Sequence, residues 1–238
     1  MKYTGVCKLC NKTCELKKSH IIPRLAVKLI RDENLKNRFY KLFNKQSKII
    51  QDVPKEYLLC YKCEQHFGNN YEKYFKETIH LSRQRVEIIQ NNNIVTIRNL
   101  DYGKIKLFLL SVLWRMSISS LTWFTNLSLG NDEDIIRKMI LEEKPRRSEE
   151  YPIAAVIPLI EGNMKEQWTS TSFVSDRTDQ AKYAMIIGGI LYFFYMKQQN
   201  NCFLPKFQLN ESGNWHMQLV DLYNIPFLKE FFESINRS

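Results

Sequence analysis

Apolar side chains that recur every three or four residues predict helices in four parts of the chain. After residue 63 they stand at positions 67, 71, 74, 75 and 79, a spacing that keeps them on one helix face. The apolar stretch 104–127 predicts a second helix, and residues 130–133 are expected to cap a third, which ends near Glu143. Residues 23–50 are interpreted as largely helical, with Pro23 in the first turn.

Short apolar runs bounded by Gly or Asn predict β-strands. Residues 85–89 and 94–98 flank Asn91-Asn92-Asn93 and are expected to form a hairpin. Further strands are expected at 153–160, 168–174, 183–187 and 190–196, with Gly188-Gly189 as a turn or bulge between the last two. The longest apolar run, 184–196, is too short to cross a bilayer, so no membrane partner is expected. Together these elements predict an α+β fold.

The distribution of charge indicates the kind of partner. Of the 238 residues, 44% are hydrophobic and 13% aromatic, which excludes a disordered tail protein. The net charge of +10 arises in residues 1–50, which hold 13 Lys and Arg against 3 Asp and Glu, whereas residues 101–238 hold 15 against 16. Such a basic region favours an anionic partner, nucleic acid first and a membrane surface second. The alternative is a solvated, lysine-rich surface without a partner.

Five of the six cysteines fall in the first 63 residues, and four of them form two C-x-x-C pairs separated by 49 residues. Each pair can bind a tetrahedral zinc ion from one tight turn, so the sequence predicts a closed structural Zn²⁺ site made of Cys7, Cys10, Cys60 and Cys63. Cys14 remains as an alternative ligand, and Cys202 is expected to be a small buried residue. The chain reaches Cys7 without a signal-peptide segment, so a reducing, cytoplasmic location is expected.

The segment between the two pairs reads Lys17-Lys18-Ser19-His20-Ile21-Ile22-Pro23-Arg24. A histidine followed by two apolar residues and a proline, between zinc-binding pairs, resembles the HNH (ββα-metal, zinc-knuckle) endonuclease motif, over about residues 5–80. The resemblance, to a two-domain bacterial form of that family, implies a treble-clef-like ββα-metal module stabilised by zinc. It also implies hydrolysis of phosphodiester bonds in nucleic acid, with DNA as the expected substrate, in a setting such as anti-phage defence.

The resemblance gives roles to individual residues. His20 matches the general base, which takes a proton from the attacking water. Ser19 stands where the family has a metal-binding Asp, and Glu64 stands where it has a second ligand, usually Asn or His. Lys55 falls near the Asn that orients the histidine. The resemblance therefore implies that Glu64 binds a catalytic Mg²⁺ or Mn²⁺ ion, while Ser19 and Lys55 depart from the pattern.

Both catalytic candidates have structural alternatives. His20 would also suit a hydrogen bond to the backbone or an additional zinc ligand, and Glu64 would suit a helix N-terminus, where the helix dipole stabilises a carboxylate. His66 is a weaker candidate, because it falls on a different helix face. The corresponding alternative function is a catalytically inactive zinc-knuckle protein that binds nucleic acid or acts as a regulator, and a protein–protein adaptor is a third option.

Basic side chains near His20 are the candidate phosphate contacts, namely Lys17, Lys18, Arg24, Lys28 and Arg31. They would position nucleic acid without reading its sequence. Arg115 lies within the apolar stretch 104–127 and is expected to pair with a core carboxylate rather than to act in catalysis.

The sequence predicts three parts along the chain. Residues 1–82 form the HNH-like zinc-knuckle module, residues 83–100 a β-hairpin linker, and residues 101–238 a larger α+β accessory or recognition domain. The last part is near neutral, so it is the candidate surface for a protein partner or for oligomer formation.

Overall fold

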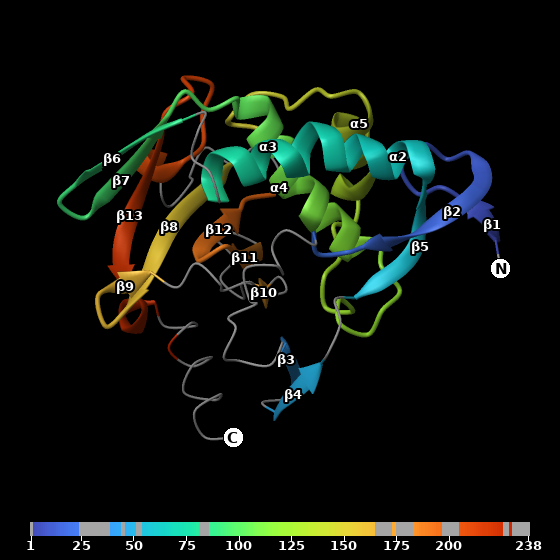
Figure 1. Cartoon of the computed structure of the whole chain (residues 1–238), viewed down its shortest axis with the longest axis horizontal. Helices are drawn as coiled ribbons and strands as arrows, with labels where there is room; N and C mark the ends of the chain where they lie inside the picture. The colour runs from blue at the N-terminus through green and yellow to red at the C-terminus, as the bar shows by residue number, and fades with distance from the viewer. Residues whose placement is uncertain are drawn as a thin grey trace.

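A computed structural model of the chain describes residues 2–23, 39–43, 46–50, 54–80, 86–164, 173–174, 183–196, 205–225 and 229. In these residues helices are combined with sheets of three, eight and two strands (Figure 1). The predicted α+β class is therefore confirmed. No helix within the described ranges has both the length and the apolar composition needed to cross a bilayer.

The N-terminal residues form a small antiparallel sheet that leads directly into a helical stretch. Strands β1 (Tyr3–Val6), β2 (Thr13–His20) and β5 (Lys55–Cys60) lie in the order β1-β2-β5. The helical stretch consists of α2 (Tyr61–His66), the π-helical η1 (Phe67–Glu72), α3 (Lys73–Phe75) and the π-helical η2 (Lys76–His80). Its predicted apolar face is confirmed, because Phe67, Tyr71 and Phe75 are buried.

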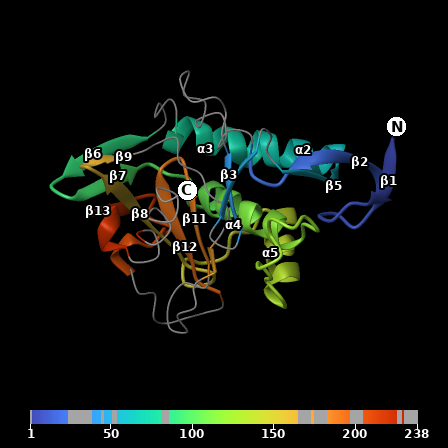
Figure 2. The ribbon, with the colours of Figure 1, turned by 90° about the horizontal axis from the view of Figure 1, so that it is seen from below.

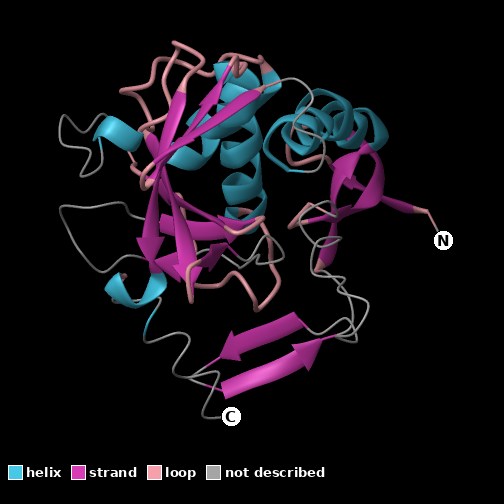
Figure 3. Ribbon diagram, turned by 60° about the vertical axis from the view of Figure 1, so that its left-hand side comes forward, coloured by secondary structure: helices cyan, strands magenta, loops and turns pink. Residues whose placement is uncertain are grey.

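Residues 39–50 form a hairpin, so the helix predicted over residues 23–50 is wrong in this part. Strands β3 (Phe39–Phe43) and β4 (Gln46–Ile50) pair antiparallel as a separate two-stranded sheet (Figure 3). Phe39 is paired with Ile50 and Tyr40 with Ile49, and cross-strand pairs of aromatic and β-branched residues favour a sheet. Residues 24–38 of the predicted helix lie outside the described residues.

The C-terminal part is built on an eight-stranded sheet of order β10-β11-β12-β8-β13-β7-β6, with β9 paired to β8. Its strands are β6 (Glu87–Asn91), β7 (Ile94–Arg98), β8 (Ile153–Ile160), β9 (Asn163–Met164), β10 (Phe173–Val174), β11 (Tyr183–Ile187), β12 (Ile190–Phe194) and β13 (Trp215–Asp221). Their pairing is antiparallel except between β13 and β8. The strands predicted at 153–160 and 183–187 are confirmed with the same bounds, whereas residues 168–172 lie outside the described ranges.

Two predicted hairpins are confirmed at their turns. Gly188 and Gly189 have φ angles of 61° and 75°, the left-handed conformation that a two-residue hairpin turn requires, and they join the paired residues Ile187 and Ile190. The hairpin of β6 and β7 turns at Asn92, where φ is 51°. Because β7 also pairs with β13, this hairpin forms one edge of the large sheet. The division of the chain at residues 82 and 100 stays a prediction.

Helix α4 (Tyr102–Ser117) is buried along most of its length. It begins after Asp101, whose side chain accepts a hydrogen bond from the Lys104 amide at 3.0 Å. It ends earlier than predicted, where Ser119 and Ser120 donate hydrogen bonds to Glu56 of β5. The other helices within the described ranges are α5 (Asp132–Leu141), close to its predicted position, and the 3₁₀ turns η3 (Pro205–Phe207) and η4 (Leu222–Asn224).

Helix α4 joins the small sheet and the large sheet in one core. Phe75 of α3 stacks on Phe108 of α4 with ring centroids 4.1 Å apart, and its ring lies 6.5 Å from that of Tyr192 in β12. Figure 2 shows the helical stretch, α4 and the large sheet side by side. A single buried apolar cluster extends from Cys7 in the small sheet region to Met217 in β13. The position of the small sheet is therefore fixed by residues far along the chain.

Candidate metal centre

Four cysteines from the two C-x-x-C pairs come together beside the small sheet. The Sγ atoms of Cys7, Cys10, Cys60 and Cys63 all lie within 4.8 Å of one another. Cys7 and Cys63 are buried, and the other two are half-buried. Four thiolates at this spacing could hold one metal ion such as Zn²⁺. The cluster that the sequence predicted is therefore present.

The first pair lies in a tight turn between β1 and β2. The Asn11 amide donates to the carbonyl of Cys7 at 2.8 Å, and the Cys7 amide donates to the carbonyl of Lys12 at 3.0 Å. Asn11 has a φ of 58°, a left-handed conformation that asparagine adopts more readily than most residues. The turn therefore points both sulfur atoms toward the same space.

The second pair lies where β5 ends and α2 begins. Cys60 is the last residue of the strand, and Cys63 lies in the first turn of the helix. The Cys60 amide donates a hydrogen bond to the Cys7 sulfur at 3.3 Å. A bulge in β5 leaves Leu58 without a partner in β2, and its carbonyl accepts a hydrogen bond from the Lys8 amide at 2.9 Å. The bulge thus joins the two halves of the cluster.

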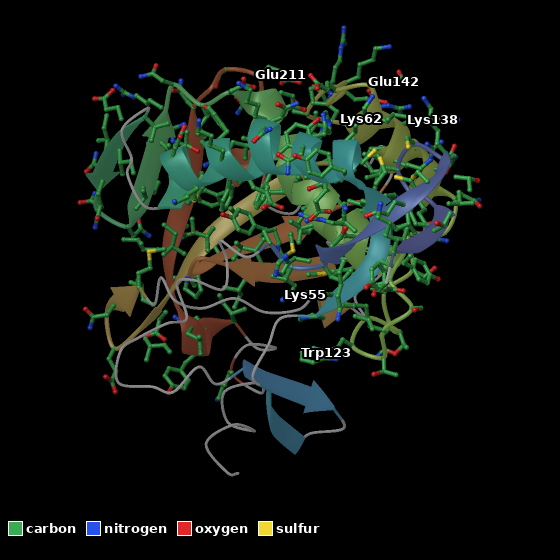
Figure 4. The ribbon with its side chains drawn as sticks, turned by 45° about the vertical axis from the view of Figure 1, so that its right-hand side comes forward. Lys55, Lys62, Trp123, Lys138, Glu142 and Glu211 are labelled. Carbon is green, nitrogen blue, oxygen red and sulfur yellow. The ribbon has the colours of Figure 1, made fainter. Side chains whose placement is uncertain are left out.

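Helix α5 also contacts the cluster region. The Arg137 guanidinium donates to the carbonyl of Leu9, inside the first C-x-x-C turn, at 2.8 Å. Figure 4 shows the labelled Lys62 of α2 and Lys138 of α5 close to the group of yellow sulfur atoms. The turn is therefore supported by a helix more than a hundred residues later in the sequence.

The thiols of Cys7 and Cys63 share a proton, and a site that holds a proton between two sulfur atoms can also hold a metal cation. A hydrogen bond from the Cys63 thiol lowers the pKa of Cys7 to about 4, and the same bond raises the pKa of Cys63 far above its ordinary value. Metal ions bind thiolates, so a cation in the cluster would take the place of the shared proton. Cys14 lies outside this group of four, and its sulfur donates to the Lys12 carbonyl at 3.3 Å.

Ser19 and Glu64 meet beside this cluster although 45 residues separate them. The fully buried Ser19 hydroxyl donates a hydrogen bond to the Glu64 carboxylate at 2.5 Å. Ser19 comes from β2, and Glu64 lies in the first turn of α2, directly after Cys63. The two positions at which the resemblance implies metal ligands are therefore in contact. The same location also satisfies the alternative role of Glu64 as a helix N-terminal carboxylate.

His20 is the last residue of β2 and is half-buried. It is paired in register with Lys55 of β5. Neighbouring residues of a strand point to opposite faces, so Ser19 faces the helix and Glu64, while His20 lies on the other face, together with Lys18. The structure thus brings Glu64 to Ser19 and leaves His20 on the opposite side of the strand end.

Arg115 of α4 binds the backbone at the end of β2. Its Nη1 donates to the His20 carbonyl and to the Glu72 carboxylate, both at 3.1 Å, and its guanidinium lies over the Phe67 ring. The predicted pairing of Arg115 with a carboxylate is confirmed, but Glu72 is half-buried rather than in the core. The contact with His20 was not predicted, because the two residues are 95 positions apart and no local sequence pattern connects them.

The predicted phosphate contacts are only partly described. Lys17 is half-buried and bonds to Glu15 at 2.7 Å, and this partner raises the pKa of Lys17. Lys18 is exposed on β2. Arg24, Lys28 and Arg31 lie outside the described residues. The weaker candidate His66 makes contacts that link the helical stretch to α5 and the residues after it, with Nε2 3.4 Å from the Ile140 carbonyl and Nδ1 3.4 Å from Glu143.

Within the described ranges, no second group of three or more His, Cys, Asp or Glu side chains could hold a metal ion. Glu64 therefore belongs to no such group, and a catalytic Mg²⁺ or Mn²⁺ site is not supported by a cluster of ligands. Comparison with protein-family models, with curated proteins and with solved structures finds no match to the chain. Its function must be argued from its own residues.

Proposed function

We propose that the chain is a metal-dependent, HNH-like nuclease that hydrolyses phosphodiester bonds in nucleic acid, with DNA as the expected substrate. The observation that carries the proposal is the contact between Ser19 and Glu64. The resemblance implies that the residue before His20 and the residue after the last cysteine meet at the catalytic site. In this chain these two residues touch beside a four-cysteine cluster.

The four cysteines would hold a structural zinc ion. A turn supplies two ligands, and the junction of a strand and a helix supplies the other two, so a tetrahedral ion would have no open coordination position for water or substrate. This ion would take no part in the chemistry. Its role would be to keep β2, β5 and α2 in place around Ser19 and Glu64.

Glu64 and His20 would divide the chemistry between them. The Glu64 carboxylate and the Ser19 hydroxyl offer oxygen ligands to Mg²⁺ or Mn²⁺, ions that often bind through one or two protein ligands and the substrate phosphate. Such an ion would stabilise the charge that develops on the phosphate. His20 would accept the proton of the attacking water. Because His20 ends its strand, the substrate would lie across that end, between His20 and Glu64.

The metal dependence is tested with supercoiled plasmid in the presence and absence of Mg²⁺ or Mn²⁺. We expect Glu64→Gln, which removes the charge but keeps the shape, to reduce the cutting rate about 100-fold. The matched control is Glu87→Gln, an exposed carboxylate in β6. Both variants should keep the metal content of the wild type. Equal cutting by the two variants would contradict the role of Glu64.

A nucleic-acid-binding protein without catalysis is the second candidate function. It is favoured by two observations: the Ser19 hydroxyl already occupies the Glu64 carboxylate, and strand alternation places His20 on the other face of β2. Tight binding without cutting under Mg²⁺, Mn²⁺ and Zn²⁺ would support this function over the first.

A further inference from the structure

Two tyrosines form an exposed stack on the small sheet. The rings of Tyr3 in β1 and Tyr57 in β5 have centroids 4.7 Å apart and planes inclined by 21°. Tyr3 is 53% exposed and Tyr57 41% exposed. Apolar side chains that are grouped at the surface, rather than scattered, often mark interaction sites, so this stack is a candidate contact surface.

The stack lies on the same face of the sheet as His20. Tyr57 is paired with Lys18, and Lys55 is paired with His20, without a register shift between these two pairs. Directly paired residues point to the same face, as do residues two apart in a strand. Tyr57, Lys18, Lys55 and His20 therefore share one face, and Tyr3 joins them through its stack on Tyr57.

This face is also basic. Strand alternation places Lys18 and Lys55 on it, whereas Glu15 of β2 and Glu56 of β5, which is paired with Ser19, point to the other face. All three nearby glutamates are engaged elsewhere, Glu64 by Ser19, Glu56 by Ser120 and Glu15 by Lys17. The tyrosine face thus combines aromatic rings with an excess of lysines, the combination that single-stranded nucleic acids require for stacking and for phosphate contacts.

We propose that the Tyr3–Tyr57 stack binds an unpaired base, so that the substrate is single-stranded or locally unpaired nucleic acid. Lys18 and Lys55 would contact the flanking phosphates. A duplex keeps its bases stacked on one another and offers them no free face, so the tyrosines would contribute little to duplex binding. The proposal deepens the proposed function by naming its substrate class, but binding to the tyrosine face does not require cutting.

Binding is measured with the full chain in its metal-loaded state and without added Mg²⁺ or Mn²⁺, by fluorescence anisotropy of a labelled oligothymidylate of about 15 nucleotides. A duplex of the same length is measured in parallel. We expect Tyr57→Ala and Tyr3→Ala to weaken single-strand binding about 5- to 100-fold each and to change duplex binding little. Tyr57→Phe should bind like the wild type. Tyr223→Ala, which removes a tyrosine that is 52% exposed in η4, is the matched control.

Replacing a large side chain by alanine can also lower stability, so a second pair of variants separates binding from folding. Tyr3→Leu and Tyr57→Leu keep an apolar cover on the sheet but remove the aromatic faces. They should retain the metal and the unfolding midpoint of the wild type and still lose single-strand binding. Unchanged binding by the doubly substituted leucine variant, or an equal loss on single strand and duplex, would overturn the proposal. If the wild type binds single strands through the tyrosines but never cuts nucleic acid, the proposed nuclease function is wrong and the proposed base-binding site is still supported.

Discussion

Two cations are buried in helix α4, and their partners differ. Lys106 donates hydrogen bonds from its ammonium group to the Tyr102 hydroxyl at 2.8 Å and to the carbonyls of Arg147 and Glu150, both at 2.6 Å. Burial lowers the pKa of Lys106 to about 7. Arg115 instead is held by a carboxylate and a carbonyl from two other elements. Lys106 therefore holds the loop that contains Arg147 and Glu150 against α4, whereas Arg115 joins the small sheet to the core.

The lowered pKa of Lys106 predicts a pH dependence of stability. Between a folded pKa of about 7 and the ordinary 10.5, the unfolded chain binds a proton that the folded chain does not bind. The free energy of unfolding should therefore rise with pH across this window, by about 1.4 kcal/mol per pH unit from this group. Urea unfolding at about pH 7.5 and about pH 9, with the same measurement on Lys106→Met, checks this slope.

In Lys106→Met the slope that this group contributes should disappear. The variant should also be less stable than the wild type, because the carbonyls of Arg147 and Glu150 lose their donor. The same pH slope in both proteins would show that the ammonium group keeps its proton throughout this window.

At the scale of elements, the strand β2 and the helix α4 depend on each other. The Arg115 guanidinium bridges the end of β2 and Glu72 of the helical stretch, and it is almost fully buried. Arg115→Met would leave the Glu72 carboxylate without its partner in the core. Because water still reaches the half-buried Glu72, we expect a loss of about 1.5–3 kcal/mol in the free energy of unfolding.

The control for Arg115 is Arg98→Met, which breaks an exposed ion pair with Glu87. Exposed pairs contribute less than about 1 kcal/mol, so the Arg98 variant should unfold close to the wild type. Urea unfolding of the two variants should therefore differ clearly. Coincident unfolding curves would show that α4 does not support the end of β2.

The cysteine cluster is the second link between elements, because it joins the β1–β2 turn to α2. We expect Cys60→Ser to release the bound metal and to unfold the small sheet, since metal binding in closed sites contributes directly to folding. Mass spectrometry of the native protein and limited proteolysis measure the two effects. Cys14→Ser, outside the cluster, should retain the metal. Unchanged metal content in Cys60→Ser would contradict the assignment of these ligands.

Most elements could be predicted from their local patterns, and the contacts between them could not. The helical stretch after residue 60, the hairpin of β6 and β7 and the turn at Gly188-Gly189 follow from spacing and turn chemistry alone. The hairpin of β3 and β4 was missed, because the apolar positions of residues 23–50 were assigned to a helix, whereas Phe39 is paired in register with Ile50.

At the scale of the whole molecule, the cysteine cluster could be predicted from the sequence, but the contacts around it could not. The spacing of the cysteines was sufficient to predict their cluster, because two C-x-x-C pairs together supply the four ligands of a tetrahedral metal site. The contacts of Ser19 with Glu64 and of Tyr3 with Tyr57 depend on how β1, β2, β5 and α2 pack. Exposed tyrosines carry no signal in a single sequence that would distinguish them from core residues.

The concentration of positive charge in the first 50 residues predicts a strong salt dependence of nucleic-acid binding. If about four lysines or arginines contact phosphates, affinity should fall about 100-fold between about 50 mM and about 200 mM salt. Titrations at several salt concentrations give this slope directly. Failure to bind DNA or RNA even at low salt would instead favour a protein–protein adaptor.

The central claim, catalysis by His20, is tested most directly by single-turnover cleavage with His20→Ala. His216→Ala is the matched control, because this histidine lies in β13 and bonds to Thr96. With Mg²⁺ or Mn²⁺ and equal metal content, we predict that His20→Ala cuts about 100- to 10,000-fold more slowly than the wild type, while His216→Ala cuts at the wild-type rate. Cutting by His20→Ala at the wild-type rate would contradict the assignment of His20 as the general base.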